Sequence, residues 1–66
     1  MNATKATNAL FASASRNIAN IAQHMGERVY VEYAKDGIVY IHLLHSGRRY
    51  GLKMRGTKVA CSFLAV

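Results

Sequence analysis

The spacing of apolar residues changes at Gly26, and this change divides the chain into a helical part and a strand part. Before Gly26, apolar residues recur at helical spacing within an arc of about 120°, the width of a stripe that faces a core. These residues are Leu10, Phe11, Ala14, Ile18, Ile21, Ala22 and Met25. After Gly26 they alternate with polar residues, as in strands with one buried face. The pattern predicts an α+β fold whose N-terminal amphipathic helix covers about residues 4–25 and ends at Gly26 in a left-handed C′ conformation.

Glycine-containing turns divide the rest of the chain into four predicted strands, which form an antiparallel meander with the helix packed across one side. The strands are expected at about 28–34, 38–44, 48–54 and 57–64. The three turns can be placed so that Val, Ile and Leu share one face of the sheet. Because three separate turns lead to the same inner face, the meander is favoured. The 66 residues are expected to form a single small domain.

The first turn is predicted as a three-residue loop, residues 35–37. A two-residue loop would set Val31 opposite His42, whereas the three-residue loop sets Val31 opposite Ile41. The same register directs Tyr33 toward the core.

The second and third turns are predicted at residues 46–47 and 55–56 by the same rule. The resulting pairs are Ile41 with Leu52 and Leu52 with Val59, and the inner face is expected to continue through Cys61 to Phe63.

A break in the helical part near residues 12–15 is an alternative to the single helix. It would give two short helices followed by a hairpin wing, as in a helix-turn-helix protein that binds DNA with a polar helix face. The apolar stripe runs through residues 12–15 without interruption, which favours one helix.

Positive charge is concentrated near the C-terminus. Residues 48–58 hold five of the nine Lys and Arg residues, no acid follows Gly37, and the formal net charge is +6. A one-sided array of cations suits an anionic partner. By alternation along the strands, most of these cations share the outer face with tyrosines. The predicted binding residues are Arg28, Tyr30, Tyr40, His42, Arg49, Lys53, Arg55 and Lys58.

Aromatic rings among cations are typical of surfaces that stack the bases of single-stranded nucleic acid. We therefore expect a small non-catalytic protein that binds nucleic acid, preferably single-stranded, through the outer face. A regulator or inhibitor that docks on an acidic surface of a larger host protein would use the same side chains. A homodimer formed through the outer face or the last strand is a third alternative, because a domain this small buries little surface.

The residues needed for catalysis or metal binding are not grouped in the sequence. The acids Glu27, Glu32 and Asp36 form no paired site, and His42 and His45 are expected on opposite faces of a strand. The sequence predicts no enzymatic activity, no metal and no cofactor.

The cysteine content and the apolar runs bear on the compartment. The single cysteine, Cys61, excludes an internal disulfide and suits a reducing cytoplasm. The apolar runs are shorter than the roughly 20 residues that span a bilayer, so no membrane partner is expected. In size and charge the chain resembles accessory proteins of bacteriophages and mobile elements, a resemblance that implies no particular activity.

Overall fold

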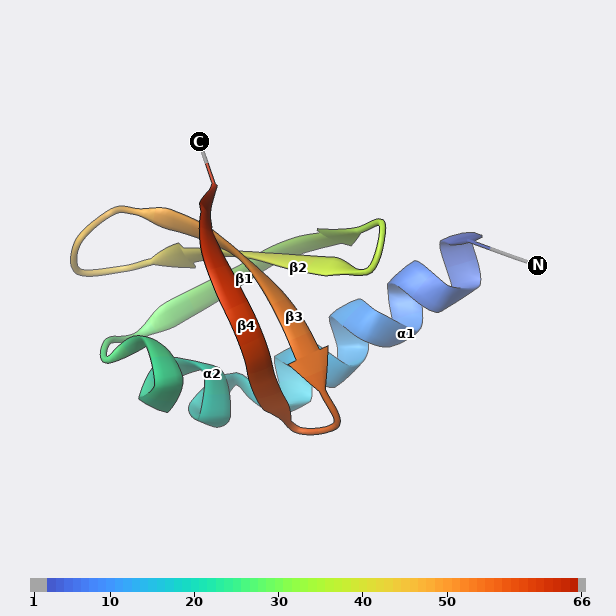
Figure 1. Ribbon diagram of the computed structural model, residues 1–66, viewed down its shortest axis with the longest axis horizontal. Coiled ribbons are helices and arrows are strands. Elements are labelled where there is room, and N and C mark those ends of the chain that lie inside the picture. Colours follow the sequence, from blue (N-terminus) through green and yellow to red (C-terminus); the bar gives the residue numbers. More distant parts are fainter. Residues whose placement is uncertain (1–2, 66) are drawn as a thin grey trace.

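A computed structural model describes residues 3–65 of the chain. Two helices precede four strands: α1 (Ala3–Arg16), α2 (Ile18–Met25), β1 (Val29–Lys35), β2 (Ile38–Leu43), β3 (Arg49–Arg55) and β4 (Lys58–Ala65). The strands form one antiparallel sheet in the order β1-β2-β3-β4. The helices follow one another along one side of the sheet, and the β3–β4 turn reaches them (Figure 1). The α+β class and the meander are confirmed.

The prediction of one helix is wrong, because Asn17 separates α1 from α2. The Asn17 side chain donates a hydrogen bond to the Ser13 carbonyl (2.8 Å), and its backbone has φ −114° and ψ 28°. Asparagine commonly competes with the helical ladder in this way. Residues 12–15, where the alternative break was expected, lie within α1. A helix-turn-helix joins its helices by a turn of three or four residues, so the single residue here does not fit that motif.

The predicted end of the helical part is confirmed. Gly26 has φ 82°, and its N–H donates to the Ala22 carbonyl at 2.9 Å. Glycine adopts this left-handed conformation without the steric cost of a Cβ.

The hydrophobic core lies between the helices and the inner face of the sheet. Its buried members all belong to the predicted apolar stripe or the predicted inner face: Ala14, Ile21, Val29, Val31, Val39, Ile41, Leu43 and Leu52. Since alternate residues of a strand face opposite sides, burial of Ile41 and Leu52 directs Tyr40 and Lys53 outward.

The β1–β2 loop has two residues, not the three that the sequence predicted. Both residues of the Asp36-Gly37 loop have positive φ, 54° and 79°, as a type I′ turn requires. Lys35 therefore pairs with Ile38. A β-bulge further along β1 supplies the extra residue, so Val31 still pairs with Ile41 as predicted.

This bulge places Tyr33 on the outer face, so the expectation that Tyr33 faces the core is wrong. The register shifts between Val31 and Tyr33, and Tyr33 pairs with Tyr40 instead of Val39. The Tyr33 side chain is 50% exposed. One extra residue reverses the alternation that follows it.

A second bulge has the same effect on β4. The β3–β4 register shifts between Lys53 and Met54, so Cys61 pairs with Lys53 and Phe63 pairs with Gly51. Lys53 and Gly51 face outward, hence Cys61 and Phe63 do too. The prediction that these two residues point into the core is wrong, and both are exposed.

The pairing of β2 with β3 differs from the prediction by two residues. Ile41 lies opposite Tyr50, not Leu52, because the loop over residues 44–48 is longer than the predicted turn. A shift of two residues keeps every side chain on its predicted face.

The carboxylate of Glu27 holds this longer loop in place. Its Oε1 accepts hydrogen bonds from the backbone N–H groups of His45 (2.8 Å) and Ser46 (2.9 Å). The bond from Ser46 is the main reason that the pKa of Glu27 lies below its usual value, with a smaller contribution from His45. Hydrogen bonds to a carboxylate favour its charged form.

We predict that replacing Glu27 with Gln removes a pH-dependent part of the stability. A pKa that is lower in the folded than in the unfolded chain stabilises the fold above the unfolded value, near 4.5, and this contribution is lost as the pH falls through the folded pKa. Wild type should therefore melt at a higher temperature than Glu27→Gln near neutral pH, and the two curves should converge in acid. Circular dichroism melts over a pH series measure this, and a pH-independent difference would contradict it.

We predict that Leu52→Ala destabilises the fold by about 2–5 kcal/mol, because it leaves a cavity at a fully buried position. Urea unfolding measures this change. Leu44→Ala is the matched control, since Leu44 lies exposed in the β2–β3 loop; it should cost about 0.5 kcal/mol or less. Equal costs for the two variants would be inconsistent with the assigned core.

Candidate nucleic-acid interface

Cross-strand rows of side chains make up the outer face of the sheet. The polar row consists of Tyr30, His42, Arg49 and Ala65, which pair successively from β1 to β4. The aromatic row beside it consists of Tyr33, Tyr40, Gly51 and Phe63, paired in the same way. Beyond the aromatic row lie the pairs Lys35 with Ile38 and Lys53 with Cys61.

The aromatic row begins with two stacked tyrosines. The ring centroids of Tyr33 and Tyr40 are 4.8 Å apart, and their planes differ by 20°. Such stacking contributes about 0.5–1.5 kcal/mol beyond area burial and holds both rings in position. Tyr33 is half-exposed and Tyr40 is partly covered. The pair therefore presents a preformed aromatic surface at one end of the row.

Gly51 lets the row continue to Phe63. A Cβ built on Gly51 would overlap the tip of the Phe63 ring, so this ring occupies the space above the β3 backbone. Glycine in a strand often marks such a close approach. The neighbours of Gly51 across the sheet are thus Tyr40 and Phe63. The Phe63 side chain remains 45% exposed.

Glu32 organises the polar row. Its Oε2 lies 3.6 Å from Nε of Arg49 and 3.7 Å from Nδ1 of His42. Glu32 is the extra residue of the β1 bulge, and because it follows the inward-facing Val31, its carboxylate lies on the outer face. An arginine has five N–H donors, so one carboxylate contact leaves others for a ligand. Arg49 is thereby oriented beside the aromatic row.

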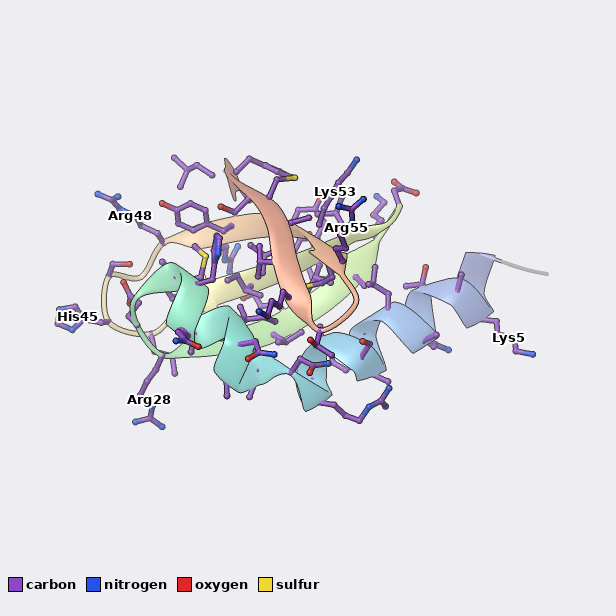
Figure 2. All side chains as sticks on the ribbon, turned by 60° about the horizontal axis from the view of Figure 1, so that its bottom comes forward. Lys5, Arg28, His45, Arg48, Lys53 and Arg55 are labelled. Atoms are coloured by element: carbon purple, nitrogen blue, oxygen red, sulfur yellow. The ribbon has the colours of Figure 1, made fainter. Side chains whose placement is uncertain are left out.

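Beyond the aromatic row, two cations lie at the end of β3, in addition to Lys35 of β1. Figure 2 shows the side chains of Lys53 and Arg55 close together on this end of the sheet. Arg55 pairs with Lys58 across the last turn. Lys58 also borders a shallow hollow beside α2, together with Asn20, Gln23, His24 and Val59.

The polar contact between α2 and the last turn fixes this hollow. The Asn20 side chain donates a hydrogen bond to the Thr57 carbonyl at 2.9 Å. Lys58 therefore lies at the boundary between the outer face and the helix side.

Arg28 does not join the other predicted cations. Its side chain points away from Lys53 and Arg55 in Figure 2. It borders a second hollow with residues of α2, including Ala19 and Ala22. Arg28 therefore lies on the helix side of the molecule.

The structure thus groups most of the predicted site and adds residues that the sequence reasoning missed. The grouped residues are Tyr30, Tyr40, His42, Arg49, Lys53 and Arg55, with Lys58 at the boundary. The additions are Tyr33, Lys35 and Phe63. The position of Tyr33 was indicated by the sequence. Asp36-Gly37 is a favoured two-residue hairpin turn, and a two-residue turn can pair Val31 with Ile41 only if β1 contains a bulge.

Comparisons with models of protein families, with curated proteins and with solved structures found no match. Within residues 3–65, His, Cys, Asp and Glu side chains form no group of three that could hold a metal ion. Neither helix in this part of the chain has the length and apolarity to cross a membrane. The geometry of the outer face is therefore the main indication of what the protein binds.

We predict that Gly51 and Phe63 are energetically coupled. In the wild-type background Gly51→Ala should be strongly destabilising, because the added methyl group displaces the Phe63 ring. In the Phe63→Leu background, which lacks this ring, the same substitution should be less destabilising. A double-mutant cycle by urea unfolding should give a coupling of at least about 0.5 kcal/mol. Additive effects would show that the ring does not lie over Gly51 in solution.

Proposed function

We propose that the protein binds single-stranded nucleic acid on the outer face of its sheet. Bases would stack on the aromatic row, and phosphates would lie along the cations that flank it. The observation that carries the proposal is the aromatic row itself: rings from β1, β2 and β4 on one face, with Arg49 on one side and Lys53 on the other.

The dimensions of the row suit more than one base. Strands lie about 4.8 Å apart, so the row extends over about 14 Å from Tyr33 to Phe63. Stacking is tolerant of sequence because every base has a π-face. The expected binding is therefore weakly sequence-dependent.

The charges of the face support a polyanionic ligand. Lys35, Arg49, Lys53 and Arg55 contribute four cations, and Glu32 contributes one carboxylate that is paired with Arg49 and His42. Neutralising a phosphate releases counterions. For single strands, log K should therefore fall by about 0.7 per phosphate contact for each tenfold rise in salt concentration. Four phosphate contacts predict a slope of about −3 in a plot of log K against the logarithm of salt concentration.

A protein-binding regulator is the second candidate function. The exposed Phe63 and the carboxylate of Glu32 on the same face favour it, since protein interfaces combine aromatic anchors with polar groups of both signs. The partner would be an acidic surface of a larger protein, docked on the same cations.

A salt titration separates the two candidates. Fluorescence anisotropy should be measured with labelled oligo-dT, oligo-U and a duplex of equal length. Tighter binding of single strands, with a slope near that expected for four phosphates, supports the proposal. Absence of binding even at low salt, together with co-purification of one host protein, would instead support the regulator.

We predict that Lys53→Glu weakens oligonucleotide binding and makes the salt slope shallower by about one, as expected for loss of a phosphate contact. Arg28→Glu is the matched control, because it changes the net charge equally but acts on the helix side. Its effect should be clearly smaller. Equal losses in the two variants would mean that only overall charge matters.

We predict that Tyr40→Leu lowers affinity through the loss of a stacking ring. The expected cost is about 1–3 kcal/mol, or about 5–150-fold in Kd. Tyr30→Leu, in the polar row, should have a smaller effect, and both variants should retain the wild-type circular dichroism spectrum. A greater loss of affinity in Tyr30→Leu than in Tyr40→Leu would contradict the prediction and would place the binding surface along the β1 edge.

A further inference from the structure

Strand β4 forms an open edge of the sheet and is exposed on both of its faces. Within residues 3–65 it pairs with β3 alone. Cys61 and Phe63 are exposed on the outer side, and Ser62 and Leu64 are exposed on the helix side, where Leu64 is 57% exposed. An open edge carries backbone N–H and C=O groups that another strand can pair with.

Both edge strands contain a β-bulge, at Glu32 in β1 and at Ala60 in β4, but β1 carries further features that prevent strand addition. It carries charge at Glu32 and Lys35, and both helices pack against it. Charges and bulges are the devices that protect edges in monomeric proteins. After Lys58, residues 59–65 of β4 are all uncharged. Edge β1 is thus protected by its charges and by both helices, whereas β4 is left open along residues 61–65.

We infer that β4 pairs with the β4 strand of a second copy of this chain. The two strands would run antiparallel about a two-fold axis near Ser62, and two four-stranded sheets would form one continuous sheet. In this register Cys61 lies opposite Phe63 of the second copy, and Leu64 lies opposite Ala60. No charged residue faces another across the interface.

The chemistry of the edge selects a second copy over an acidic peptide. An acidic strand would need cations along β4, but the only charged residue of β4 is Lys58, at its first position. A strand without charges over its central residues fits this edge, and residues 59–65 of β4 are such a segment. Pairing would also cover Leu64 and enlarge the small core, which is the usual remedy for a chain of this size.

The positive net charge does not prevent this association. Lys58 is the one outer-face cation on β4, and it lies about 13 Å along the strand from the axis near Ser62. Arg49 and Lys53 belong to β3, one strand inside the edge. Across the two-fold axis the β3 strands would lie about 14 Å apart. This separation exceeds the Debye length of about 8 Å at physiological ionic strength, so their repulsion is largely screened.

Pairing through β4 also extends the proposed binding surface, a consequence that rests on the proposed function. A two-fold axis perpendicular to the sheet keeps both outer faces on the same side, so the two aromatic rows would end on adjacent strands, offset by two residues, with each Phe63 beside Cys61 of the other copy. An oligonucleotide long enough to reach both copies should bind more tightly than a short one. This length dependence should disappear in a monomeric variant.

Sedimentation velocity without nucleic acid tests the dimer. Wild type should show a concentration-dependent monomer–dimer equilibrium. Leu64→Lys should raise the dimer Kd about tenfold or more, because it adds a charge and removes apolar contact at the edge. Leu44→Lys is the matched control: Leu44 is 54% exposed, close to Leu64, but lies in the β2–β3 loop. Its Kd should change by about twofold or less.

Two outcomes would overturn the inference. One is a wild-type protein that remains monomeric up to about 100 µM, a concentration at which only very weak association escapes detection. The other is a dimer that Leu64→Lys and Leu44→Lys affect equally.

Hydrogen exchange of the unmodified protein provides a second measurement, which does not depend on the folding of a variant. Amides in residues 59–65 should exchange more slowly as concentration rises, and those in residues 29–35 should slow by a clearly smaller factor, which reflects only the overall stabilisation. Unchanged exchange in residues 59–65 of a dimeric sample would overturn the inference. A dimer that binds no oligonucleotide would overturn only the proposed function, and a monomer that binds oligonucleotides would overturn only the dimer.

Discussion

Burial of one face of the sheet against the helices is the constraint from which the rest of the structure follows. Val39, Ile41 and Leu52 are completely buried, and they lie on the two central strands. Since neighbouring residues of a strand face opposite sides, their burial directs Tyr40 and Lys53 to the outer face. A shift of one residue in either strand would place apolar side chains in water and is therefore strongly disfavoured. The proposed interface is thus a direct consequence of core packing.

The two β-bulges modify this outer face without disturbing the core. Each adds one residue to one strand and so reverses the side on which the residues after it in that strand lie. The first bulge brings Tyr33 beside Tyr40, and the second brings Phe63 over Gly51. A continuous aromatic row results from local irregularities in β1 and in the pairing of β3 with β4. Without them, the face would carry cations and only isolated rings.

Strand β4 contributes to both the proposed nucleic-acid binding and the proposed dimer, and different residues on its two faces are involved. Phe63 belongs to the aromatic row on the outer side, whereas Leu64 is exposed on the helix side. The backbone of the same strand offers the open edge. A substitution of Leu64 can therefore test dimer formation while the aromatic row stays intact. If both proposals hold, assembly of two copies and enlargement of the binding surface are one event.

The sequence by itself determined the change from helical to strand periodicity, the helix end at Gly26, every buried position of the core, and the outward direction of Tyr40, Arg49 and Lys53. These properties depend on local spacing, which is readable from neighbouring residues. Only the tertiary structure decided the placement of Tyr33, Phe63 and Arg28 and the length of the β2–β3 loop. The bulges that turn Tyr33 and Phe63 outward, and the bonds from Glu27 to a loop 18 and 19 residues away, arise from contacts between segments distant in the chain. Periodicity within one segment carries no information about such contacts, because it records which side a residue faces and not what lies across from it.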